Sequence, residues 1–154
     1  MHPAQNSTPM PKVIYNQAKA GHGYDLLAIA LDDIIPTCQT IEATSHRSRR
    51  TAEERYPQWR GTLAKVVRSA IAADRRWMGR KHPFPLHPVD VFRADIYILE
   101  YILHKIMPER AASEASGTPV CDNYPQWIHD LDGMVKDAVT KDRAYYYGTQ
   151  RTDI

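Results

Sequence analysis

The sequence contains little of what secreted scaffolds and membrane proteins depend on. Its two cysteines, Cys38 and Cys121, lie far apart and form neither a disulfide framework nor a CxxC motif. No apolar run reaches the roughly 18 residues that a membrane span needs. The chain does not begin with a basic region followed by an apolar run, so we expect no signal peptide. Two free thiols and no leader predict a cytoplasmic protein.

The residue patterns of common enzymes are also missing. Seven scattered glycines form neither a P-loop nor a GxGxxG pattern, and no histidine pair has HExxH or ExxH spacing. A helical nucleotide hydrolase would need carboxylates three or four residues apart to hold Mg²⁺, but Asp90 and Asp95 are five apart and Asp130 and Asp132 are two apart. Sequence order leaves a Ser–His–Asp or Cys–His arrangement open, although nothing marks a nucleophile elbow. We therefore predict a non-enzymatic protein with no cofactor and no metal.

What the sequence does contain is the composition of one globular domain. Its 154 residues are 43% hydrophobic and 25% charged. A chain of this length and composition can form a substantial core without disulfides or structural metals. The proline-rich N-terminus predicts a flexible arm over residues 1–21, and the last residues predict a short tail over 146–154. The remaining residues, 22–145, are expected to form the domain.

Apolar residues recur at helical spacing in four stretches, residues 23–40, 60–81, 89–107 and 124–145. We expect Pro36 to kink the first helix and Pro108 to stop the third. Between the helices we expect a polar connection over 41–59, in which Thr51 and Glu54 form a capping box, and a long loop over 109–123. No internal repeat with a period of 20–50 residues is found. The prediction is an all-α, antiparallel up-down four-helix bundle.

The third predicted helix is apolar over most of its circumference. Only Arg93, Tyr97, Glu100 and His104 form a clear polar strip. Because the protein is small, a second burying surface is most simply another subunit. We therefore predict a homo-oligomer whose interface includes Val91, Ile98, Tyr101 and Ile102.

The second predicted helix has one apolar face, which includes Trp77 and Met78, and cations on the opposite face. Residues 46–82 hold eleven Lys/Arg and three Asp/Glu, a net +8, while the rest of the chain carries −6. One interpretation is that these cations form a solvated helix face with no specific role. The functional interpretation is that they contact nucleic-acid phosphates, without base readout. The candidate nucleic-acid-binding residues are Arg47, Arg49, Arg50, Arg55, Arg60, Lys65, Arg68, Arg75, Arg76, Arg80 and Lys81.

Two carboxylates fall among apolar positions, Asp74 in the second helix and Asp95 in the third. A buried carboxylate needs a partner. We expect an ion pair with Arg93, Arg60 or Lys81, from a neighbouring helix or subunit, rather than a catalytic role.

Four short motifs occur in an order that resembles a known family. They are YPQWRGTL and then AADRR in the second helix, FRAD at the start of the third, and YPQWIHDLDGMV in the fourth. Over residues 22 to 142 the chain looks like the accessory variability determinants of diversity-generating retroelements. Related bundles are encoded in ribosomal-RNA intervening sequences.

The resemblance implies a specific function. Proteins of this family form a five-fold ring of bundles and bind the reverse transcriptase and template RNA of their element, with no catalysis of their own. By resemblance, we expect a cytoplasmic pentamer that binds structured RNA and a reverse transcriptase through its basic residues and supports cDNA synthesis. Two alternatives stay open: an oligomeric scaffold or adaptor that binds no nucleic acid, and, less favoured, a small helical nucleotide hydrolase.

Overall fold

The computed structural model describes residues 21–80 and 89–145. The predicted arm, apart from Gly21, and the predicted tail lie outside these residues, as does the proline-rich connection after the second helix. The described chain is helical and contains no strand. It consists of α3 (Gly23–Ile29), the π-helix η1 (Ala30–Ile34), α4 (Ile35–Thr44), α5 (Ser48–Glu53), α6 (Tyr56–Gly79), α7 (Ala94–Tyr101), the π-helix η2 (Ile102–Ile106), α8 (Met107–Ser116), the 3₁₀ turn η3 (Val120–Asn123) and α9 (Tyr124–Arg143).

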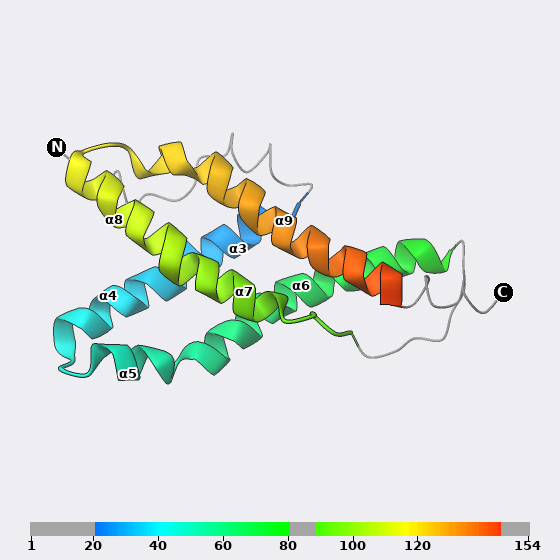
Figure 1. The fold of residues 1–154 in the computed structure, drawn as a ribbon, viewed down its shortest axis with the longest axis horizontal. Coiled ribbons are helices and arrows are strands. Elements are labelled where there is room, and N and C mark those ends of the chain that lie inside the picture. The colour runs from blue at the N-terminus through cyan, green and yellow to red at the C-terminus, as the bar shows by residue number, and fades with distance from the viewer. Residues whose placement is uncertain (1–20, 81–88, 146–154) are drawn as a thin grey trace.

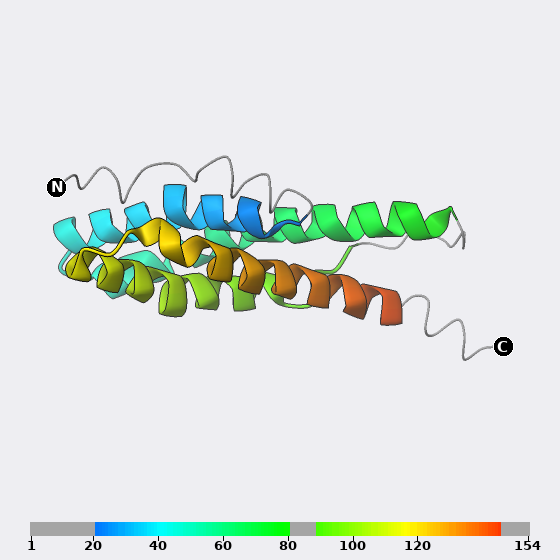
Figure 2. The same cartoon turned by 90° about the horizontal axis from the view of Figure 1, so that it is seen from above.

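These elements form four long helical segments in two layers. The first segment, α3–η1–α4, and α6 run in opposite directions and make one layer, and α7–η2–α8 and α9 make the other (Figure 1). Figure 2 shows the two layers stacked, and Figure 1 shows that their axes cross. The prediction of an all-α four-helix bundle is therefore confirmed for the described residues.

The core lies between the layers and takes side chains from all four segments. Trp59 of α6 and Trp127 of α9 are its largest members, and both are almost fully buried. Leu26, Ile34 and Ile102 also belong to the core, at 0% exposure. The predicted apolar faces of the first and fourth helices are confirmed as core, because burial of these rows stabilises an otherwise marginal helix.

Two prolines expected to interrupt helices are accommodated inside them. Pro36 and Pro108 each follow a π-helical turn, in which the N–H of Ile35 reaches Ala30 O and the N–H of Met107 reaches Ile102 O. Proline has no N–H, and its ring clashes with the carbonyl four residues earlier; a widened turn relieves both problems. The prediction that Pro108 stops the third helix is therefore wrong.

The two predicted connections contain more helix than expected. The first helix runs to Thr44, and residues 48–53 and 56–59 are helical, so the polar connection is short. Thr51 lies within α5 and contacts the Ser45 hydroxyl, so the predicted capping box with Glu54 is wrong. The predicted loop 109–123 is mostly α8, which ends at Gly117 with a φ of 75°. The Ala-rich run favours helix, and a glycine in the left-handed region is the usual stop.

The third segment begins later than predicted. Phe92 and Arg93 have φ values of 52° and 64°, which delays the start of the helix to Ala94. Ile98, Ile102 and Ile106 are fully buried, whereas Phe92 and Ile96 are only half-buried. The predicted polar strip is confirmed, because all four of its residues are exposed.

The bundle is built from two similar helical hairpins, although no repeat was expected. Residues 56–75 and 124–143 align without a gap, and nine of the twenty positions are identical. Both stretches begin with Tyr-Pro-Gln-Trp and end with Asp-Arg. The two Tyr–Trp ring pairs, Tyr56–Trp59 and Tyr124–Trp127, have the same centroid separation of 6.0 Å and similar interplanar angles of 36° and 40°. The shift of 68 residues is longer than the 20–50 residue periods of short helical repeats.

The other two segments correspond in the same way, with a shift of 72 residues. The π-helix at 30–34 matches the one at 102–106, Pro36 matches Pro108, and the ten-residue α4 matches the ten-residue α8. The packing is equivalent too, since α3 packs on α9 as α7 packs on α6. Each half can therefore be compared with the other. Features that both halves share are those that the fold requires, and features found in only one half are not required by the fold.

Candidate nucleic-acid interface

The cations of the candidate site lie along α5, α6 and the ends of these helices, which follow one another along one side of the molecule (Figure 1). On α6, Lys65, Arg68 and Arg76 share an exposed strip about 16 Å long, at a rise of 1.5 Å per residue. We call the exposed cations of this region the basic face. It comprises Arg47, Arg49, Arg50, Arg55, Lys65, Arg68, Arg76 and Arg80.

Most members of the basic face have no acidic partner. Arg49 pairs with Glu53 at 3.3 Å, and both side chains are at least half exposed. Within residues 21–80 and 89–145, none of the other members forms an ion pair. Exposed guanidinium groups of this kind are free to make forked contacts to phosphate.

Arg75 does not belong to this face, which corrects the prediction. It is 8% exposed and forms a bidentate ion pair with Asp142 of α9, whose side chain is fully buried. Arg75 lies beside the buried row on the helix circumference, so the angle predicted from sequence was too coarse to assign it. Lys81, another predicted contact, lies outside the described residues.

Trp77 was predicted in the core but is 49% exposed. The end of α6 extends beyond the start of α3, so no helix of the first segment covers it (Figures 1 and 2). The guanidinium of Arg143 lies 5.6 Å from the centroid of the indole ring, within the range of a cation–π contact.

Of the two carboxylates singled out in the sequence, one has an ion-pair partner. Asp74 accepts hydrogen bonds from Arg143 of α9, with the Nε at 3.0 Å, so its partner is none of the three candidates. Asp95 is half-exposed in the first turn of α7, where a carboxylate is favoured by the helix dipole. Neither residue belongs to the basic face.

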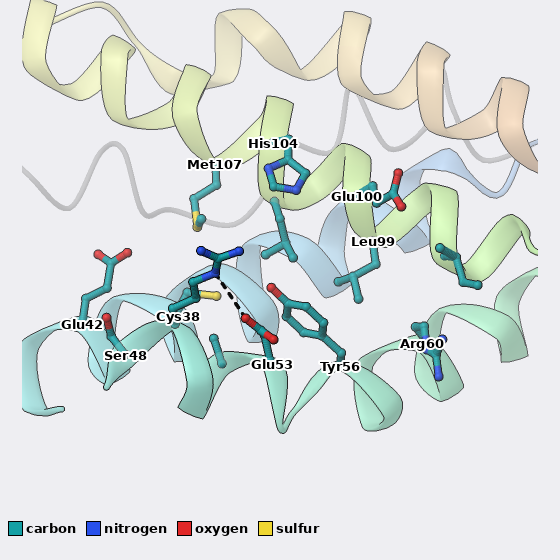
Figure 3. Close-up of a pocket in the computed structure, with 14 residues that line it drawn as sticks. Cys38, Glu42, Ser48, Glu53, Tyr56, Arg60, Leu99, Glu100, His104 and Met107 are labelled. Carbon is teal, nitrogen blue, oxygen red and sulfur yellow. Dashed lines mark ion pairs between the residues drawn. The ribbon is translucent and has the colours of Figure 1, made fainter. Parts of the chain in front are cut away.

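Arg60, the last predicted contact, lines a groove instead of the outer strip. The groove has a volume of about 720 Å³ and lies between α4, α5 and the start of α6 on one side and α7, η2 and the start of α8 on the other. Figure 3 shows His104 and Met107 reaching from one wall towards Tyr56, Glu53 and Cys38 on the opposite wall. The Nε of Arg60 is buried and has no hydrogen-bond partner among the described residues. Sequence reasoning missed this groove, because its walls come from distant segments.

Burial shapes the chemistry of the groove. It raises the pKa of the Cys38 thiol, with a smaller contribution from Glu42, and it raises the pKa of the Tyr56 hydroxyl, with smaller contributions led by Glu53. Both groups are therefore neutral at physiological pH and act as weak donors. The aromatic ring of Tyr56 and the side chains of Leu103 and Met107 provide apolar surface around them.

The residues predicted for a subunit interface lie inside the chain's own core. Val91, Ile98 and Ile102 are 8%, 0% and 0% exposed. Tyr101 is half-buried and donates a hydrogen bond to Asp130 of α9. The apolar excess of the third segment is thus used within the bundle, because this segment packs on both α6 and α9.

The outer face of α9 is the internal reference for the basic face. Arg68 corresponds to Lys136, which pairs with Asp132 at 3.0 Å, and the nearby Lys141 pairs with Asp137 at the same distance. The same hairpin framework therefore folds with its outer cations neutralised. The unpaired cations of α6 are not required by the fold.

Over residues 21–80 and 89–145, no group of three or more His, Cys, Asp or Glu side chains is arranged to hold a metal ion. No helix in the described chain combines the length and apolarity that membrane crossing requires.

Comparison with known proteins gives no independent assignment. No family model, curated protein or solved structure matches the chain.

Proposed function

We propose that this protein binds RNA through the sugar–phosphate backbone, using the basic face. The observation that carries the proposal is the contrast between two equivalent helices. On α9 the outer lysines pair with aspartates four residues away, and on α6 Lys65, Arg68 and Arg76 have no such partner. Unpaired cations concentrated on one helix favour an anionic partner that supplies many charges in a row.

The test is a triple substitution of the α6 strip, K65A/R68A/R76A. Binding of a fluorescent structured RNA is measured by anisotropy across a salt series. The wild type is expected to lose affinity steeply as salt rises, and each lost phosphate contact should lower the log–log slope by about 1. Arg75 is left unchanged, because its substitution would break a buried ion pair.

The matched control is the double substitution K136A/K141A on α9. It removes two exposed lysines from the equivalent helix and should leave RNA affinity and its salt dependence unchanged. Equal losses in the two variants would show only a general dependence on net charge. Unchanged affinity in the α6 variant would contradict the proposal.

We also propose, on the resemblance to accessory variability determinants, that the RNA is a reverse-transcription template and that the protein acts without catalysis of its own. A retroelement reverse transcriptase is assayed on such a template with and without the protein. Added wild type is expected to raise cDNA yield, and the α6 triple variant is expected not to. A yield that does not respond to the wild type would contradict this part and leave RNA binding in place.

A homo-oligomer without nucleic acid is the second candidate. One observation favours it: the basic face of one copy complements exposed carboxylates of another, such as Asp32 and Asp33 on η1. Native mass measured with and without RNA separates the candidates. An oligomer that is indifferent to RNA would support the scaffold, and a salt-sensitive RNA complex would support the first proposal. A pentamer would agree with the resemblance.

A further inference from the structure

The groove is open beside Tyr56 and Arg60 of the first hairpin, whereas the matching positions of the second hairpin are buried. Tyr56 and Arg60 are half-buried, and their counterparts Tyr124 and Ile128 are 3% and 8% exposed. The core packing that both halves share therefore does not require the groove.

The difference lies in the connections within each hairpin. The connection after α8 contributes Val120 to the core at 1% exposure. The connection after α4 is longer and forms α5, which has no buried residue. Space is therefore left between α5 and the η2 segment, and Arg60 lines its wall.

Arg60 keeps its charge and lines the groove, so its accessible guanidinium N–H groups favour a ligand that carries a hydrogen-bond acceptor. The volume of about 720 Å³ falls in the range of small-molecule sites. Tyr56 offers an aromatic surface, while Glu100 and His104 add an acceptor and a second polar group at the rim. A flat ring with both donors and acceptors on its edge satisfies these groups better than an aliphatic chain would.

We propose that the groove binds an unstacked base of single-stranded RNA whose phosphates contact the cations of α5. This inference rests on the proposed function. Arg47, Arg50 and Arg55 are exposed on and beside α5, the helix that forms part of one wall of the groove. The carboxylates of Glu42 and Glu100 repel phosphate, so the base enters and the backbone stays outside. Stacking on aromatic side chains and contacts to base edges are how proteins recognise unpaired RNA.

The test fills the groove without removing a cation of the basic face. Ala52 lines the groove on α5 and is partly exposed, so A52W blocks the space, and A43W on the exposed side of α4 is the matched control. Both variants are checked for helicity by circular dichroism and assayed with ten-nucleotide single strands of each base and with a twelve-base-pair RNA duplex. A52W is expected to lose about 5-fold or more in affinity for single strands. Its duplex affinity should not change.

A second variant and a crosslink keep the proposal falsifiable if A52W does not fold. R60M removes the unpaired donor and keeps the apolar stem, so it should reduce the differences in affinity among the four bases. A strand carrying 5-iodouridine should crosslink to the peptide that contains Tyr56 or to the one that contains Met107.

The outcomes distinguish this inference from the proposed function. Unchanged single-strand affinity in a folded A52W, or crosslinks confined to the outer strip of α6, would overturn the base site and leave backbone binding intact. Such a result would indicate that the groove binds a ligand of another class, such as a peptide. A wild type that binds neither single strands nor duplex would overturn both.

Discussion

Arg75 and Asp142 form a buried ion pair that joins α6 to α9. The Nη2 of Arg75 lies 2.6 Å from Oδ1 of Asp142, and the Nε lies 3.1 Å from Oδ2. The neighbouring residues, Asp74 and Arg143, make the reciprocal pair between the same two helices. Each pair joins the Asp of one Asp-Arg sequence to the Arg of the other, as expected where two equivalent helices meet.

Substituting either member of the buried pair should destabilise the fold strongly. R75M would leave the Asp142 carboxylate buried at 0% exposure without its partner. The expected loss is about 3–5 kcal/mol in the free energy of unfolding, measured by urea denaturation. D74N, which affects the more exposed reciprocal pair, should cost about 1 kcal/mol or less. Similar losses in the two variants would contradict the assignment of the buried pair as the main link.

Arg110 provides a contrasting prediction at a similar degree of burial. It is 7% exposed, and within residues 21–80 and 89–145 its Nε and Nη1 have no hydrogen-bond partner. Because R110M removes unsatisfied donors, the variant should be as stable as the wild type or more stable, by about 1–3 kcal/mol. Urea denaturation beside R75M gives the comparison, and a loss in R110M comparable to that in R75M would show that Arg110 is satisfied in solution.

The four helical stretches and their buried rows could be predicted from the sequence, because burial repeats with the helical period. The endpoints could not. Pro36 and Pro108 disfavour helix locally, but burial of Ile34 and Ile106 in the core outweighs this local preference. A π turn before each proline lets the helix continue. Arg75 could not be assigned either, since its partner Asp142 is 67 residues away.

The candidate site, too, could be predicted only in part from the sequence. Exposed cations such as Arg68 and Arg76 follow from their angle on α6. The groove beside Arg60 depends on the distance between α5 and η2. This distance cannot be predicted from a local sequence pattern. The hairpin repeat was available in the sequence, because YPQW occurs at 56 and at 124, but its period lies outside the range in which short helical repeats are found.

Glu109 should make the stability depend on pH. The indole N–H of Trp127 donates to its carboxylate at 2.7 Å and Lys105 lies at 3.0 Å, and both lower the pKa of Glu109. A carboxylate with a lowered pKa in the folded state stabilises above its unfolded pKa, and this contribution is lost as the pH falls through the folded pKa. We therefore expect the stability of the wild type to decline as the pH falls below about 4.5.

The E109Q variant isolates this contribution from that of other carboxylates. It should be less stable than the wild type at pH 7, and the difference should shrink as the pH is lowered, as measured by urea denaturation at each pH. E114Q is the matched control, because Glu114 is exposed on the same helix and has no ion pair within the described residues. A constant difference between E109Q and the wild type across the pH range would contradict the prediction.

Glycine substitutions should separate helix propensity from close packing. Gly61 is exposed in the interior of α6, and a Cβ there would meet no atom within 4 Å. G61A should therefore stabilise the protein by about 0.5–1 kcal/mol, since alanine loses less conformational entropy in a helix. At Gly23, by contrast, a Cβ would lie 2.3 Å from the backbone oxygen of Ile128. G23A must push α3 away from α9 and should cost about 1–3 kcal/mol. Thermal melting of both variants tests this, because 1 kcal/mol corresponds to a shift of about 2–4 °C at this size. A rise in melting temperature for G23A would mean that α3 does not approach α9 this closely in solution.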